Sequence, residues 1–152
     1  MLRKTSYNVS TLFGLGFIRF MPGTFGSIVG LLSGFLILKY TFFEFFILQL
    51  FFTFIISTYL LKVYQEYTNK KDSSDIIIDE YIGQQVPFIF LDITLSNIIM
   101  FFIFFRFFDI LKFFPANFID KKYKNCMGVM LDDIIAGIQT TVLIYIINNF
   151  LI

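Results

Sequence analysis

Histidine is absent from the 152-residue sequence, and its absence removes several familiar kinds of active site. Phosphatases with a histidine nucleophile, hydrolases with a serine–histidine–aspartate triad and zinc sites built on histidine all need the imidazole ring. Cys126 is the single cysteine, so an internal disulfide is also excluded. Any chemistry must therefore run on carboxylates, lysine, arginine and hydroxyl groups, with or without a hard metal ion.

Charged residues are scarce as well. They make up 15% of the chain and hydrophobic residues 57%, whereas soluble domains have about 25% charged residues. The net charge of +1 offers no basic surface for a nucleic acid, so no nucleic-acid partner is expected. No segment points to an obligate protein partner. The composition predicts an integral membrane protein, and the length suits a single membrane-embedded domain over residues 1–152.

Five apolar runs divide the chain, and strand signals between them are weak. Backbone groups in lipid must be satisfied within their own segment, so each run is expected to be a helix. A turn-rich stretch at 92–97 separates the third run from the fourth, with Ser96 or Asn97 as the expected cap of the fourth helix. The sequence predicts an all-α bundle of about five short transmembrane helices. The runs are residues 26–38, 45–61, 76–91, 95–111 and 134–152.

The distribution of basic residues predicts how such a bundle is oriented. With five passes, every lysine and arginine except Lys39 lies on the same side as the N-terminus. A single span through 81–105 would instead divide them evenly, and it loses to the five-pass topology by the positive-inside rule. The N-terminus is therefore predicted to be cytoplasmic. All acidic residues except Glu44 and Asp92 lie on that side too, so the polar chemistry is expected there.

A glycine-rich turn leads into the first apolar run. In residues 22–27, "PGTFGS", the glycines let backbone approach a ligand, and Thr24 is the expected N-cap of the following helix. The start of a helix presents free N–H groups to anions. An ordinary turn and cap explain the same residues. Further on, Gly26, Gly30 and Gly34 recur at intervals of four, which predicts a surface for close helix packing.

Two acidic pairs adjoin apolar runs. Asp79 and Glu80 stand at the start of the third run, and Asp132 and Asp133 directly precede the fifth. Acidic residues favour the first turn of a helix, so capping alone explains each pair. Neighbouring residues on a helix point about 100° apart, so the members of a pair need not share a ligand.

Three charges interrupt the apolar stretch that ends the fourth run. Arg106, Asp109 and Lys112 follow at intervals of three and form a stripe on one side of a helix. Anchoring at the membrane surface explains Lys112 better than the other two. Ionisable groups inside a membrane are costly and usually functional.

The five-pass topology brings all of these features to one membrane face. Clustered carboxylates repel one another unless a cation lies between them, and Mg²⁺ combines carboxylate ligands with phosphate oxygens. Arginine, lysine and backbone N–H groups suit a phosphate. The sequence therefore predicts a site for Mg²⁺ and a lipid phosphate.

Three blocks resemble the bacterial phosphatidylglycerophosphatase A family: "PGTFGS" at 22–27, "IIIDEYIG" at 76–83, and "FRFFDILKFFP…MGVMLDDIIAG" at 105–137. The resemblance implies an Mg²⁺-dependent phosphatase of the inner membrane that hydrolyses phosphatidylglycerophosphate to phosphatidylglycerol and phosphate. Its partners would be the membrane and that phospholipid. The resemblance implies metal-binding or catalytic roles for Asp79, Glu80, Asp109, Asp132 and Asp133. It implies phosphate-binding roles for Arg106, Lys112, Gly23, Thr24 and Ser27.

Two other functions compete with this interpretation. A phosphatidyltransferase that uses CDP-lipids also places carboxylates and Mg²⁺ at the membrane face, but "DDIIAG" lacks the glycine and arginine of its D-x-x-D-G-x-x-A-R signature. A small transporter or structural membrane protein predicts polar residues through the whole membrane depth. Here they gather at one face.

Overall fold

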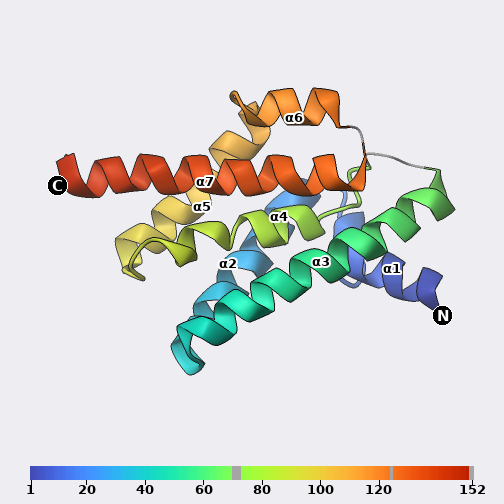
Figure 1. The fold of residues 1–152 in the computed structure, drawn as a ribbon, viewed down its shortest axis with the longest axis horizontal. Coiled ribbons are helices and arrows are strands. Elements are labelled where there is room, and N and C mark those ends of the chain that lie inside the picture. The colour runs from blue at the N-terminus through green and yellow to red at the C-terminus, as the bar shows by residue number, and fades with distance from the viewer. Residues whose placement is uncertain (70–72, 124, 151–152) are drawn as a thin grey trace.

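The computed structural model describes residues 1–69, 73–123 and 125–150, and within these ranges it contains helices and no β-strand (Figure 1). The predicted all-α fold is therefore confirmed. The elements follow in the order α1 (Leu2–Ser10), the 3₁₀ helix η1 (Leu15–Phe17), α2 (Pro22–Tyr40), α3 (Phe43–Thr68), α4 (Ile78–Gly83), the 3₁₀ helix η2 (Val86–Ile89), α5 (Leu95–Leu111), α6 (Ala116–Lys122) and α7 (Cys126–Phe150).

The bundle exposes large apolar side chains and buries polar ones, as membrane proteins do. Large apolar side chains such as Phe52 and Ile103 are about half exposed on its outside, at 55% each, while Ser27 and Gln85 are fully buried. Among the described residues, α2, α3 and α7 are long and apolar enough to cross a bilayer. α5 has 17 residues, slightly fewer than the ~20 that a bilayer core requires.

The prediction of about five membrane helices is wrong at the third apolar run. Residues 76–91 fold as the six-residue α4 and the short η2 rather than as one helix. Pro87 has no N–H to donate and so cannot continue an α-helix here. Irregular backbone is tolerated at membrane depth where protein surrounds it. Most of α4 is buried, and Figure 1 shows it between α3 and α7.

The predicted helix caps also need correction. α2 begins at Pro22 and not after Thr24, because proline suits the first helical position. Thr94, rather than Ser96 or Asn97, caps α5, since its hydroxyl oxygen accepts from the Asn97 N–H at 3.1 Å. α7 begins at Cys126, so Asp132 and Asp133 lie well inside the helix and are not needed as caps.

Glycines bring α4 close to its two neighbours. A Cβ on Gly26 of α2 would lie 2.7 Å from the Ile77 carbonyl oxygen, and one on Gly34 would lie 3.0 Å from the Phe88 ring. The predicted glycine packing surface on α2 is therefore present. On the other side, a Cβ on Gly137 of α7 would lie 2.5 Å from the Gly83 carbonyl oxygen. These contacts fix the acidic start of α4 against both helices.

Replacing Gly137 with valine is expected to destabilise the protein by about 2 kcal/mol, because the added carbons force α7 away from α4. The obstructing atoms are backbone at Gly83 and the Val86 side chain, which cannot swing aside. Thermal unfolding in detergent, followed by circular dichroism, measures the change. Val142→Ile, which adds a carbon on the exposed side of α7, is the control. An unchanged midpoint for Gly137→Val would show that α4 and α7 do not pack this closely.

The membrane orientation stays a prediction. Lys70, Lys71 and Lys124, which belong to the basic residues that predict it, lie outside the described residues.

Candidate active site

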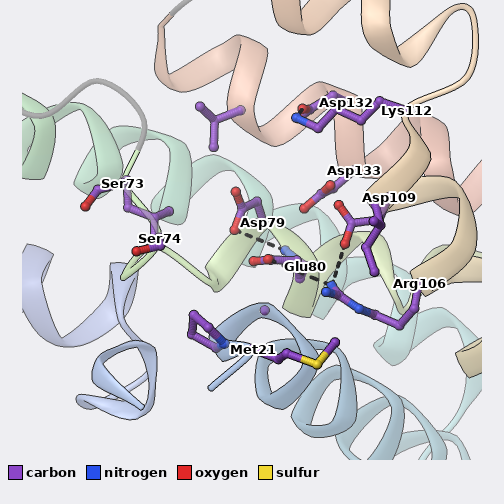
Figure 2. A pocket seen from close by; sticks show the side chains of 15 residues that line it. Met21, Ser73, Ser74, Asp79, Glu80, Arg106, Asp109, Lys112, Asp132 and Asp133 are labelled. Carbon is purple, nitrogen blue, oxygen red and sulfur yellow. Dashed lines mark hydrogen bonds and ion pairs between the residues drawn. The ribbon is translucent and has the colours of Figure 1, made fainter. Parts of the chain in front are cut away.

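A pocket of about 420 Å³ opens where the start of α2, the end of α5 and the first turns of α7 meet α4 (Figure 2). Its lining combines residues from distant parts of the sequence. The polar and charged residues that line it are Ser73, Ser74, Asp79, Glu80, Arg106, Asp109, Lys112, Asp132 and Asp133. All five carboxylates and both cations that the sequence singles out are among them. The carboxylates exceed the cations by three, so the pocket is strongly acidic.

Three of the carboxylates form a compact cluster. Oxygen atoms of Asp79, Glu80 and Asp133 all lie within 4.8 Å of one another. Asp79 and Glu80 lie in the first turn of α4, and α7, which packs against α4, brings Asp133 to them. Only 8% of Asp79 and 4% of Asp133 is exposed. This geometry allows three oxygen ligands to meet a single small cation.

Electrostatics at α4, outside the long apolar helices, agree with a site for a cation. Burial, reinforced by the neighbouring Glu80, raises the pKa of Asp79 well above its ordinary value. Burial likewise raises the pKa of Glu80 to about 7. The buried Oε2 of Glu80 has no hydrogen-bond partner among the described residues. A hard cation would stabilise the charged carboxylates and use this oxygen, so the donor set fits Mg²⁺.

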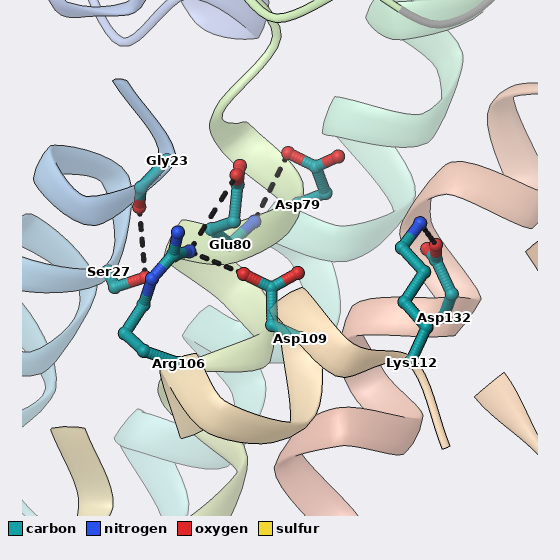
Figure 3. Close-up of polar contacts among 8 residues, drawn as sticks. All are labelled: Gly23, Ser27, Asp79, Glu80, Arg106, Asp109, Lys112 and Asp132. Atoms are coloured by element: carbon teal, nitrogen blue, oxygen red, sulfur yellow. Dashed lines mark hydrogen bonds and ion pairs between the residues drawn. The ribbon is translucent and has the colours of Figure 1, made fainter. Parts of the chain in front are cut away.

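Arg106 lies beside the cluster and is held from three sides (Figure 3). Its guanidinium is ion-paired with Asp109, one turn further along α5, and its Nη1 lies 3.9 Å from Glu80 Oε1. Nη1 also donates to Ser27 Oγ at 3.3 Å. The Ser27 hydroxyl in turn donates to the Gly23 carbonyl oxygen at 2.9 Å. α2 and α5 together therefore fix the position of the arginine next to the carboxylates.

The two members of the second acidic pair, Asp132 and Asp133, have different partners. Whereas Asp133 joins the carboxylate cluster, Asp132 accepts a hydrogen bond from Lys112 Nζ at 2.6 Å. Lys112 ends α5 in a left-handed conformation with φ of 45°. Its side chain is 34% exposed, so its ammonium group lies at the rim of the pocket.

The turn at the start of α2 contributes mainly through its backbone. Gly23 lines the pocket, and a Cβ there would collide with the Glu80 carboxylate. Thr24 and Ser27 do not line the pocket, although the sequence groups them with the phosphate-binding candidates. Ser27 contacts the site through Arg106. The side-chain oxygen of Thr24 is buried without a hydrogen-bond partner in the described part of the chain.

Sequence reasoning missed Ser73 and Ser74, which line the opposite side of the pocket (Figure 2). They belong to the polar stretch 67–75, which has the composition of an ordinary loop. Their position a few residues before the Asp79-Glu80 pair is the one signal that connects them to the site.

The fold and the pocket define a helical membrane protein whose acidic site combines clustered carboxylates with an arginine and a lysine. The sequence model of one family, phosphatidylglycerophosphatase A, matches residues 8–148. The chain belongs to this family and is a phosphoric monoester hydrolase. Family membership therefore favours the hydrolase over the phosphatidyltransferase and the transporter.

Curated relatives agree with this assignment over nearly the whole chain. A Haemophilus influenzae phosphatidylglycerophosphatase A is 30% identical over 92% of this chain and 86% of its own length. The Escherichia coli phosphatidylglycerophosphatase A is 27% identical over 90% and 80%, respectively. A Bacteroides thetaiotaomicron protein, provisionally named a phosphatidylinositol-3-phosphatase, is 28% identical over 90% of this chain and 89% of its own length. No solved structure matches the chain.

Proposed function

We propose that the protein hydrolyses the terminal phosphomonoester of phosphatidylglycerophosphate to give phosphatidylglycerol and phosphate. The reaction takes place at the cytoplasmic face of the bacterial inner membrane and depends on Mg²⁺. The observation that carries the proposal is the cluster of Asp79, Glu80 and Asp133 directly beside Arg106. The names of the Haemophilus and Escherichia relatives support the substrate. The predicted topology puts the basic residues on the same side of the membrane as the site, which supports the cytoplasmic face.

Asp79, Glu80 and Asp133 would hold Mg²⁺ through their converging oxygens. When bound, the ion supplies positive charge for the phosphoryl oxygens. The protein contributes by holding these three carboxylates close together. Without a bound cation, their negative charges would repel one another.

The cationic side chains would bind the phosphate oxygens. Arg106 is positioned by Asp109 and Ser27, so its guanidinium is already oriented when a substrate arrives. An oriented donor stabilises negative charge in the transition state without the cost of reorganisation. Lys112, at the rim, is placed to meet the phosphate as it enters. The lack of a side chain at Gly23 keeps the space next to Glu80 open.

Phosphate release from defined lipids by the purified protein in detergent tests the substrate. We expect the fastest release from phosphatidylglycerophosphate, and slower release from phosphatidylinositol 3-phosphate and from phosphatidate. Asp133→Asn protein, prepared in parallel, controls for contaminating phosphatases. A clear preference for phosphatidylinositol 3-phosphate would move the substrate assignment to that of the Bacteroides relative. Release from none of the three lipids would contradict the proposed function.

Replacing Arg106 with lysine is expected to lower kcat/KM by about 10- to 100-fold. A lysine ammonium cannot present the planar fork that contacts Asp109, Glu80 and Ser27 while facing a phosphate. Steady-state kinetics on phosphatidylglycerophosphate measure the effect. Arg3→Lys, at an arginine that lies over the Tyr67 ring, is the matched control and should retain full activity. Equal activity of the two variants would remove Arg106 from phosphate binding.

A further inference from the structure

A second pocket on the bundle has walls made only of hydrocarbon side chains. It measures about 310 Å³ and lies between α3 and α7, with α4 and η2 forming its floor. Leu50, Phe51 and Phe54 line it from α3, and Ile134 and Ile138 line it from α7. Small-molecule pockets typically begin at about 300 Å³, so this groove is large enough to hold part of a ligand.

The apolar groove and the acidic pocket are both bounded by α4 and α7. On α7, Asp133 lines the acidic pocket, and the next residue, Ile134, lines the groove. On α4, Asp79 lines the acidic pocket, and Ile82, one turn further along the same face, lines the groove. Ile138 lies five residues beyond Asp133, a rise of about 7.5 Å along the helix. Figure 1 shows α3 and α7 diverging with distance from the first turns of α7.

We propose that this groove holds one acyl chain of the lipid substrate while the phosphomonoester occupies the acidic pocket. The inference rests on the proposed function. A glycerophospholipid joins a charged head group to hydrocarbon chains through a short glycerol linker, so its binding site needs a polar part followed by an apolar part. Along both α4 and α7, residues of the acidic pocket come before residues of the apolar groove. This order matches that of the head group and the acyl chain in the lipid.

The groove would act by orientation rather than by hydrophobic affinity. Membrane lipid is as apolar as the groove, so moving an acyl chain from one to the other brings little transfer free energy. A chain held against α3 and α7 instead restricts how the attached phosphate can approach Arg106 and the carboxylates. Restricting a reactant to productive positions lowers the barrier, and small displacements cost a great deal of rate.

Filling the groove is therefore expected to affect long-chain substrates selectively. Ile138→Trp places a bulky ring in the groove and should lower kcat/KM for dioleoyl phosphatidylglycerophosphate by about tenfold, with little change for the dihexanoyl lipid. Ile146→Trp is the matched control, because Ile146 lies on the same helix, is 44% exposed against 45% for Ile138, and does not line the groove. It should leave the ratio of the two rates as in the wild type.

A second pair of variants tests the opposite wall. Phe51→Ala removes part of the groove wall, and Phe52→Ala removes an equally exposed ring outside it, at 55% against 56% for Phe51. Phe51→Ala alone should reduce the preference for the long-chain lipid, and it decides the matter if Ile138→Trp does not fold. Equal effects on both chain lengths, or none, would overturn the groove assignment while leaving the phosphatase intact. Wild-type protein that hydrolyses neither lipid would instead overturn the proposed function, and the groove assignment with it.

Discussion

Asp133→Asn is expected to abolish phosphate release from phosphatidylglycerophosphate, with a loss of about 10³-fold or more in kcat. The amide has nearly the shape of the carboxylate, so the packing of α7 against α4 is preserved. What changes is the charge and one oxygen of the cluster with Asp79 and Glu80. Because Asp133 is only 4% exposed, water cannot readily replace that oxygen. The measurement is turnover of purified, folded protein in detergent.

Two further variants show whether the effect belongs to the cluster. Asp92→Asn changes an exposed aspartate that lies outside the acidic pocket and should retain wild-type activity. Asp132→Asn should cost less than Asp133→Asn, since Asp132 contacts Lys112 and not the three-carboxylate cluster. If Asp133→Asn were fully active, the cluster would have no part in the reaction.

The sequence contained enough information to predict that the candidate site residues lie together, because charges in hydrocarbon are costly. Arg106 and Asp109 lie within an apolar stretch and therefore need charged or polar partners. The acidic pairs at 79–80 and 132–133 were the candidates for a shared site. The distribution of lysine and arginine then predicted that these segments share one side of the membrane. In the structure all of them line one pocket. These inferences needed only the order of elements and the cost of burying charge.

The finer geometry depended on contacts that periodicity does not encode. The apolar run 76–91 has the composition of a membrane helix, yet Pro87 and the close approach of Gly83 to α7 divide it into α4 and η2. The hydrogen bond between Ser27 and Arg106 joins residues 79 positions apart, so no local pattern could predict it.

Removing divalent metal is expected to stop hydrolysis completely, and adding Mg²⁺ is expected to restore it. The site holds three carboxylates whose oxygens lie within 4.8 Å of one another, two of them buried, and the neighbouring Arg106 is already paired with Asp109. Without an ion, these carboxylates would repel the anionic phosphate. Ca²⁺ prefers more ligands at longer distances than Mg²⁺, so it should restore activity less well. Activity measured after EDTA treatment and dialysis, with each ion added back, tests the prediction.

Binding measured without turnover separates a bound metal from a mere effect on the lipid. Mn²⁺ accepts the same oxygen ligands as Mg²⁺ and is visible by electron paramagnetic resonance, so it should bind the wild-type protein and be displaced by excess Mg²⁺. Asp133→Asn should weaken this binding strongly, and Asp92→Asn should not. The stabilisation of the folded protein by the ion should follow the same order, because a ligand that binds only the folded state raises the unfolding temperature. Hydrolysis that is indifferent to chelation, together with equal Mn²⁺ binding by both variants, would mean that the buried carboxylates act on the phosphate without a metal.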